Sequence, residues 1–191
     1  MSGRSTPDQR EDLGDLLARL VRDVPDFPEP GVTFKDITPL LADHDGFSAV
    51  VAALAGPNVS EPGQDGVPAV DKVVGIEARG FILAAPVALT LGAGFVPVRK
   101  TGKLPGPTYA VSYQLEYGEA TLEVHRDAIA PGERVLLVDD VLATGGTMAA
   151  ARELVQRCGG TVVAAAVVLE LSFLSGRGRI GDLPLRALST V

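Results

Sequence analysis

Two adjacent carboxylates stand at the end of an apolar run in the second half of the chain. Residues 134–138 (RVLLV) have the composition of a buried strand, and Asp139 and Asp140 follow them directly. In open α/β sheets, ligands bind beyond the carboxyl ends of the strands. Carboxylates at such a place suit sugar hydroxyls, which donate hydrogen bonds, or a metal ion. The pair is therefore the first candidate for a binding site.

A short loop separates these acids from a helix that we expect over residues 147–158. Its residues are Ala143, Thr144, Gly145, Gly146 and Thr147. The start of a helix offers unpaired N–H groups and the positive end of the dipole, so an anion fits there. The glycines let the backbone approach a phosphate without a Cβ in the way. Because carboxylates would repel that phosphate unless they faced hydroxyls or a metal, the two features together predict a ribose 5-phosphate site.

The commoner nucleotide motifs do not explain this loop. The chain has no P-loop signature, and no GxGxxG pattern occurs at this turn. The plainer alternative is a tight turn with helix-capping threonines and solvated aspartates. Two acids behind a buried strand and ahead of a helix favour the binding site.

The remaining sequence is expected to alternate strands and helices. Helices are expected over residues 12–24, 47–54, 81–91 and 147–158, and strands over 72–76, 95–99, 134–138 and 161–169. Two further strands are expected within 110–126, joined around 116–119, whereas the proline-rich residues 24–41 predict an extended, irregular path. Strands that are apolar on both faces are typical of a parallel sheet covered by helices. The sequence therefore predicts an α/β fold.

Composition limits the class of protein. The 191 residues suit a single domain with a loose polar tail at residues 1–11, and the hydrophobic content of 46% allows a sizeable core. A net charge of -7 argues against nucleic-acid binding, which depends on Lys and Arg. No apolar run is long enough to suggest a membrane span, and no signal-peptide core is present, so a cytoplasmic protein is expected.

The segment VLLVDDVLATGGT, residues 135–147, resembles the phosphoribosyl-pyrophosphate motif of type I phosphoribosyltransferases. The resemblance implies that Asp139 and Asp140 hold the ribose hydroxyls, directly or through Mg²⁺ and water, and that residues 143–147 cradle the 5-phosphate. It also implies the fold of that family, a central parallel sheet flanked by helices, with a small hood that forms a flexible lid.

Three other segments resemble the adenine phosphoribosyltransferases within this family. They are DFPEPGVTFKDITPLL (26–41), GIEARGF (75–81) and VPVRKTGKLPGPTYAVSYQLEYG (96–118). The resemblance runs from about residue 26 to residue 171. It implies purine salvage, in which adenine and phosphoribosyl pyrophosphate give AMP and pyrophosphate, by a homodimer. Two departures are Lys35, where an arginine is familiar, and Glu77, where some members have aspartate.

The same resemblance implies roles for individual residues. Glu116 is the candidate acid/base, because the attacking base must lose a proton. Arg79, Arg99, Lys100 and Lys103 would supply cations for pyrophosphate. A cis peptide between Glu77 and Ala78 would turn N–H groups toward that pyrophosphate. Residues 101–119 would form the lid, and residues 26–41 would bind the base through Val32, Thr33, Phe34 and Lys35.

Most of these residues have an ordinary alternative. Glu116 by itself would be a solvated loop carboxylate, Arg99 and Lys100 a solvated strand end, and Phe34 a core aromatic. At the level of the whole chain, one rival function is a non-catalytic regulator that senses purine metabolites, which the negative charge disfavours. The other rival is a transferase that acts on guanine, hypoxanthine or xanthine.

Overall fold

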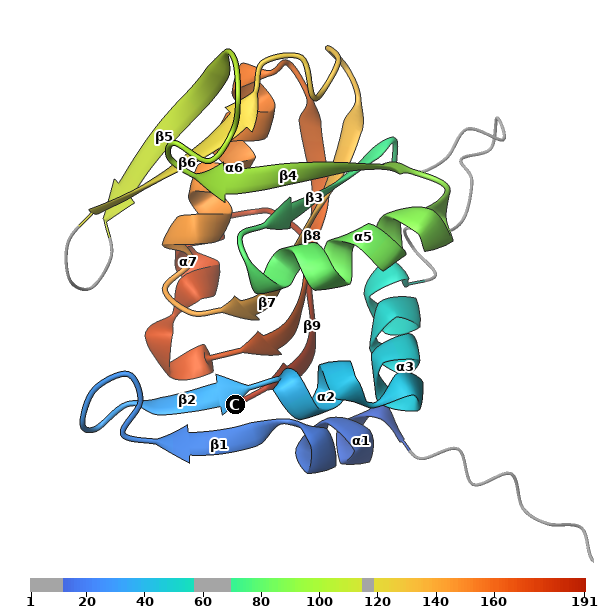
Figure 1. Ribbon diagram of the computed structural model, residues 1–191, viewed down its shortest axis with the longest axis vertical. Helices are drawn as coiled ribbons and strands as arrows, with labels where there is room; N and C mark the ends of the chain where they lie inside the picture. Colours follow the sequence, from blue (N-terminus) through green and yellow to red (C-terminus); the bar gives the residue numbers. More distant parts are fainter. Residues whose placement is uncertain (1–11, 57–69, 115–118) are drawn as a thin grey trace, which may run out of the picture. The chain divides into compact units, whose positions relative to one another are not determined.

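The computed structural model describes residues 12–56, 70–114 and 119–191 (Figure 1). The chain divides into two compact units, residues 1–49 and 50–191, which are described separately below. The single-domain organisation stays a prediction.

The first unit combines short helices with a two-stranded ribbon. Its elements are α1 (Leu13–Leu20), β1 (Arg22–Pro25), β2 (Thr33–Asp36), α2 (Thr38–Ala42) and the first part of α3 (His44–Ala55). The buried side chains of α1 are Leu16, Leu17 and Leu20, which confirms the expected apolar face.

Two expectations about this unit were wrong. The first helix ends at Leu20, because Val21 takes an extended conformation and the chain enters β1. Residues 33–36 are not irregular, since β2 pairs antiparallel with β1 in the register Val24 to Phe34. Pro25 ends β1 opposite Thr33, and Pro28 and Pro30 lie between the two strands, so no proline interrupts the middle of the ladder.

The second unit contains a seven-stranded sheet in the order β5-β6-β4-β3-β7-β8-β9. Its strands are β3 (Lys72–Ile76), β4 (Gly94–Lys100), β5 (Thr108–Gln114), β6 (Glu119–His125), β7 (Arg134–Leu142), β8 (Thr161–Glu170) and β9 (Leu185–Thr190). Pairs among β4, β3, β7, β8 and β9 are parallel, whereas β6 pairs antiparallel with β4 and β5. The α/β prediction is confirmed, with an antiparallel hairpin added at one edge.

Two long helices cover this sheet: α5 (Arg79–Leu91) joins β3 to β4, and α6 (Gly146–Arg157) joins β7 to β8 (Figure 1). The two crossovers run in opposite directions across the strand order, so right-handed connections place the helices on opposite faces. The central strands β3 and β7 are buried on both sides, with Val73, Val74, Leu136 and Leu137 fully inaccessible to solvent. This is why they read as continuous apolar runs in the sequence.

The last part of the chain contains three elements that sequence patterns did not predict. They are the 3-10 turn η1 (Ser172–Leu174), the short helix α7 (Gly176–Ile180) and β9. Strand β9 is half-buried along most of its length, so it lacks the apolar signature of the inner strands.

Within the described residues, no helix has both the length and the apolar character to cross a bilayer.

Candidate active site

The site lies where the strand order of the second unit reverses. β4 and β7 flank β3 on its two sides, so the chains that leave β3 and β7 diverge and open a crevice beyond the strand ends. A pocket of about 350 Å³ occupies this crevice. It is lined by Glu77, Ala78, Arg79, Lys100, Tyr113, Leu122, Asp139, Asp140, Val141, Leu142, Ala143, Thr144, Gly145, Thr147 and Met148. Segments that are distant in the sequence thus meet at one place.

The acidic pair lies within β7, which continues past the expected end at residue 138 to Leu142. The Oδ2 atom of Asp140 lies 2.8 Å from Nη2 of Arg79, and Asp140 is only 5% exposed. The Oδ1 atom of Asp139 accepts a 2.9 Å hydrogen bond from the N–H of Asp140. Burial raises the pKa of the Asp139 carboxyl well above its usual value, and the Asp140 charge raises it further. A second negative charge beside Asp140 is therefore unfavourable, and a nearby cation or donor hydroxyls would offset this.

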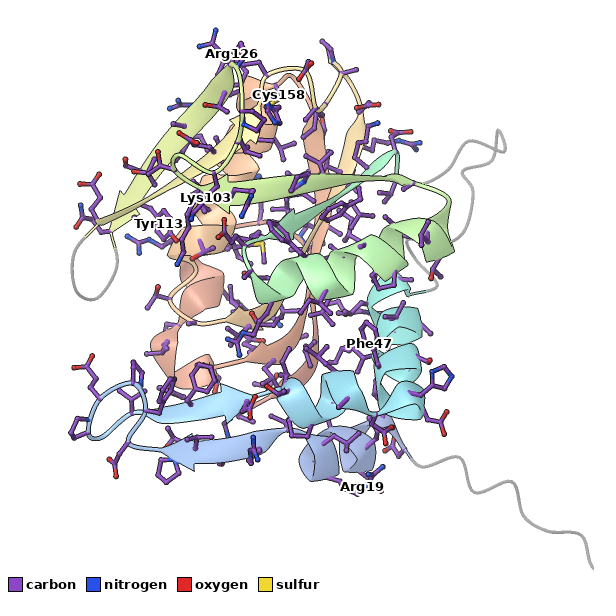
Figure 2. The ribbon with its side chains drawn as sticks, viewed as in Figure 1. Arg19, Phe47, Lys103, Tyr113, Arg126 and Cys158 are labelled. Atoms are coloured by element: carbon purple, nitrogen blue, oxygen red, sulfur yellow. The ribbon has the colours of Figure 1, made fainter. Side chains whose placement is uncertain are left out.

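The glycine-rich loop leads from β7 into α6, as expected. Gly145 has a φ of 81°, a left-handed conformation that favours glycine, and Gly146 begins the helix. The Thr147 hydroxyl lies 3.1 Å from the Tyr113 hydroxyl, which joins the loop to the end of β5. Figure 2 labels Tyr113 at this junction. A twelve-residue helix that starts in a pocket offers the N–H groups that bind phosphate.

The turn after β3 lines the same pocket as the acids. The peptide between Glu77 and Ala78 is cis, which confirms the expectation. Glu77 accepts hydrogen bonds from the Lys100 N–H at 3.0 Å and from Nε of Arg99 at 3.2 Å. Burial alone would raise the pKa of Glu77, but these two donors outweigh it and the pKa is lowered. Glu77 is thus an ionised anchor between β3 and β4, and it holds the turn that begins α5.

Some predicted residues lie outside the pocket lining. Gly146 is buried at the start of α6, and a Cβ there would come within 3.0 Å of the Tyr113 ring. Arg99 turns toward Glu77 and also donates from Nη1 to the Lys103 carbonyl at 3.2 Å. Glu116 falls outside the described residues. The roles of these residues stay predictions.

The predicted base-binding residues belong to the first unit. Val32 is 41% exposed, and Thr33, Phe34 and Lys35 lie on β2. The ring of Phe34 meets the ring of Phe27 edge-on, with centroids 5.1 Å apart. The Lys35 ammonium pairs with Asp23 at 2.7 Å. Phe34 is half-buried, so it is not a fully packed core aromatic.

Sequence reasoning missed Tyr113 as a member of the site. Its hydroxyl touches Thr147, which lies 34 positions further along the chain. No local pattern signals such a contact. The position inside the segment that resembles the family's hood was the one available hint.

Comparison with known proteins identifies the family of this chain. Residues 32–182 match the family described as the phosphoribosyl transferase domain, so the fold and the site define a phosphoribosyltransferase. An adenine phosphoribosyltransferase of Nocardioides sp. is 65% identical over 179 residues, which make up 94% of this chain and 95% of the relative. The chain belongs to the adenine phosphoribosyltransferase family.

Solved structures give the same result. The adenine phosphoribosyltransferase of Thermoanaerobacter pseudethanolicus superposes with a TM-score of 0.86 at 42% identity, covering 94% of this chain and 99% of that one. The enzyme of Trypanosoma brucei, in complex with AMP, pyrophosphate and ribose-5-phosphate, has a TM-score of 0.85 at 25% identity. That match covers 95% of this chain and 81% of the other.

Proposed function

We propose that this adenine phosphoribosyltransferase holds the ribose 5-phosphate part of phosphoribosyl pyrophosphate between β7 and α6 and joins adenine to its anomeric carbon. The products are AMP and pyrophosphate. The observation that carries the proposal is the single pocket shared by the acidic pair, the glycine-rich loop and the cis turn. The Trypanosoma brucei relative binds AMP, pyrophosphate and ribose-5-phosphate, which supports the same ligands here.

Each end of the substrate has matching groups. The 5-phosphate suits the N–H groups and hydroxyls of residues 143–147 at the start of α6. The ribose hydroxyls suit the carboxylates of Asp139 and Asp140, which accept hydrogen bonds. The pyrophosphate suits the turn at Glu77 and Ala78, where Arg79 and Lys100 line the pocket and bring positive charge.

The transfer forms one bond and breaks another at the same carbon. A ring nitrogen of adenine bonds to the anomeric carbon, and the bond from that carbon to the pyrophosphate oxygen breaks. Positive charge that develops on the purine is relieved when its proton moves to the Glu116 carboxylate. Residues 101–119, which we propose as the lid, would exclude water so that pyrophosphate is displaced by adenine rather than by hydrolysis.

Mg²⁺ fits the donors that the chain provides. Among the described residues no group of three His, Cys, Asp or Glu side chains forms a closed metal cage. Asp139 and Asp140 do offer carboxylate oxygens, and Mg²⁺ is usually held by one or two carboxylates together with waters and substrate phosphates. When bound, the ion would neutralise charge on the departing pyrophosphate. We therefore assign its protein ligands to Asp139 and Asp140, directly or through water.

For adenine, we propose the segment 26–41 as the base-binding region, with Val32, Thr33, Phe34 and Lys35 as its contacts. The support is a half-buried aromatic ring on β2 that can stack on a planar purine. We propose that backbone groups of the same segment read the amino edge of adenine.

We further propose a cytoplasmic homodimer. The outer side of α5 exposes Ile82 and Leu89, two turns apart, and the helix carries no charge after Arg79. Leu89 is 83% exposed and Ile82 is 45% exposed, so this side of α5 presents apolar side chains to solvent. A second copy of the chain is the occupant that we propose for this face.

The reaction is tested by incubating the purified chain with adenine, phosphoribosyl pyrophosphate and Mg²⁺. AMP and pyrophosphate should appear in equal amounts, and replacing Glu116 by Gln should slow their formation without preventing phosphoribosyl pyrophosphate from binding. Release of pyrophosphate without AMP would indicate hydrolysis and would contradict the proposal.

A further inference from the structure

The glycine-rich loop is backed by the short helix α7 (Gly176–Ile180). A Cβ built on Gly176 would overlap the carbonyl oxygen of Ala143 and come within 3.1 Å of the Gly145 nitrogen. Conversely, a Cβ on Gly145 would overlap the carbonyl oxygen of Gly176. The two backbones therefore touch directly, and neither position leaves room for a side chain. The loop that faces the pocket on one side rests on α7 on the other.

Helix α7 has only five residues, too few to be stable from its own hydrogen bonds. An ion pair fixes it instead. Arg177 donates from Nε and Nη2 to the two carboxylate oxygens of Glu170, each at 2.7 Å. The two parallel hydrogen bonds allow only one relative orientation of the guanidinium and the carboxylate. They therefore fix the orientation of α7 as well as its position.

Glu170 ties this ion pair to the strand that carries the acids. It is the last residue of β8, is 6% exposed, and lies opposite Leu142, the last residue of β7. The N–H of Leu171 also donates to the Leu142 carbonyl at 2.9 Å. The far end of α7 is held by Arg152 of α6, which donates to the Ile180 carbonyl at 3.0 Å. Both flanks of the loop, β7 and α6, are thus connected to α7.

We infer that Glu170, Gly176 and Arg177 position the loop of residues 143–147 for the 5-phosphate. The inference rests on the proposed function, because it assigns that phosphate to the loop. None of the three lines the pocket, so they act through the loop and are positioning residues rather than catalytic ones. Substitutions at these residues should weaken the binding of ligands that carry a 5-phosphate. They should leave the binding of pyrophosphate unchanged, because we assign that group to the turn after β3.

The decisive comparison is between two glycines of the same helix. Gly176→Ala would push against the Ala143 carbonyl, whereas a Cβ at Gly178 meets nothing within 4 Å, so Gly178→Ala is the matched control. Calorimetry should show ribose 5-phosphate binding weakened at least tenfold in Gly176→Ala, which corresponds to about 1.4 kcal/mol. The dissociation constant of pyrophosphate should stay within about twofold of that of the unmodified chain. In Gly178→Ala, the dissociation constants of both ribose 5-phosphate and pyrophosphate should stay within the same range.

Arg177→Lys and Glu170→Gln test the ion pair and serve if Gly176→Ala does not fold. Both should raise the KM for phosphoribosyl pyrophosphate while the KM for adenine stays within about twofold. Ribose 5-phosphate binding in Gly176→Ala equal to that in Gly178→Ala would overturn the inference. Equal weakening of ribose 5-phosphate and pyrophosphate would also overturn it, because it would indicate general destabilisation. An unmodified chain that binds no ribose 5-phosphate would instead refute the proposed function.

Discussion

At the scale of single residues, the acidic pair is the part of the site on which the proposed chemistry depends most. Asp140 contacts Arg79 at 2.8 Å, and Asp139 accepts the N–H of Asp140, so the two carboxylates have fixed positions. Replacing both by Asn should lower turnover by about 10²–10³-fold or more, because the ribose and Mg²⁺ lose their charged partners.

The measurement for this double variant is AMP formation together with a thermal melt. Asp127→Asn, in the turn after β6, is the control and should leave turnover unchanged. A double variant with near-normal turnover in the presence of Mg²⁺ would refute the role of the acids.

Tyr113 offers a second test at this scale. Its hydroxyl lies 3.1 Å from the Thr147 hydroxyl, and a neutral hydrogen bond of this kind contributes about 1 kcal/mol. Tyr113→Phe should therefore reduce kcat/KM for phosphoribosyl pyrophosphate about fivefold, with the melting temperature nearly unchanged. Tyr109→Phe, on the same strand, is the control. The Cζ atom of Arg126 lies 5.1 Å from the centroid of the Tyr109 ring, and a phenylalanine ring would keep this contact. Equal kinetic effects of the two variants would count against a role for the Thr147 contact.

Phe34 decides how the base is held. If its ring stacks on adenine, Phe34→Leu removes an interaction that contributes about 1–3 kcal/mol in other base-binding sites. The KM for adenine should then rise, whereas the KM for phosphoribosyl pyrophosphate should not. Steady-state kinetics with each substrate varied in turn provides the measurement. A variant with lower thermal stability and two unchanged constants would show that Phe34 only packs against Phe27.

At the scale of elements, the end of the central strands opposite the site is stabilised by an ion pair of its own. Asp71, just before β3, accepts hydrogen bonds from the Arg134 N–H at 2.7 Å and from its Nε at 3.2 Å. The Arg134 N–H lowers the pKa of Asp71 and outweighs the opposing effect of burial. Because the folded-state pKa is below the unfolded one, this stabilisation is present above the unfolded value and is lost as pH falls through the folded value.

Asp71→Asn should therefore lower the free energy of unfolding by about 1–2 kcal/mol at pH 7. The difference from the unmodified chain should shrink as the pH falls below the ordinary aspartate value of about 4 and then through the lower folded-state pKa of Asp71. Urea unfolding at pH 7 and at low pH measures this. A difference in unfolding free energy that stays constant with pH would contradict an ionic contribution. Turnover should be unaffected, because Asp71 lies at the end of the strands opposite the site.

The elements that the sequence predicted well are those with a strong local signal. β3 and β7 are buried on both faces and read as continuous apolar runs, and α6 begins at the glycine pair of residues 145–146. By contrast, β9 is half-buried and α7 has five residues, so neither has a periodicity that can be recognised. The end of α1 at Leu20 was missed because Val21 and Val24 continue the helical spacing although the chain has become extended.

The same distinction applies to the site. The acids and the glycine-rich loop are contiguous, so their types and order predicted a phosphate and ribose site. The contacts of Gly176 with Ala143, and of Tyr113 with Thr147, join positions more than thirty residues apart. Such contacts are set by packing in three dimensions, and no spacing in the sequence encodes them. The family resemblance supplied the adenine assignment, which periodicity and composition could not.

At the scale of the whole molecule, the proposed function requires that ribose 5-phosphate is joined to adenine rather than to another purine. An adenine edge presents an amino donor beside a ring acceptor, and hypoxanthine presents the reverse. A base of the wrong kind would leave buried donors or acceptors unpaired, which produces large discrimination. Selectivity for the base thus tests the substrate assignment and the chemistry together.

The most direct measurement is a competition among bases. The purified chain is given phosphoribosyl pyrophosphate, Mg²⁺ and equal amounts of adenine, hypoxanthine and guanine, and the nucleotides formed are quantified by mass spectrometry. We expect AMP to exceed the other nucleotides by about 10²-fold or more, with one pyrophosphate released per AMP. Equal or preferential formation of the hypoxanthine or guanine nucleotide would contradict the proposed function.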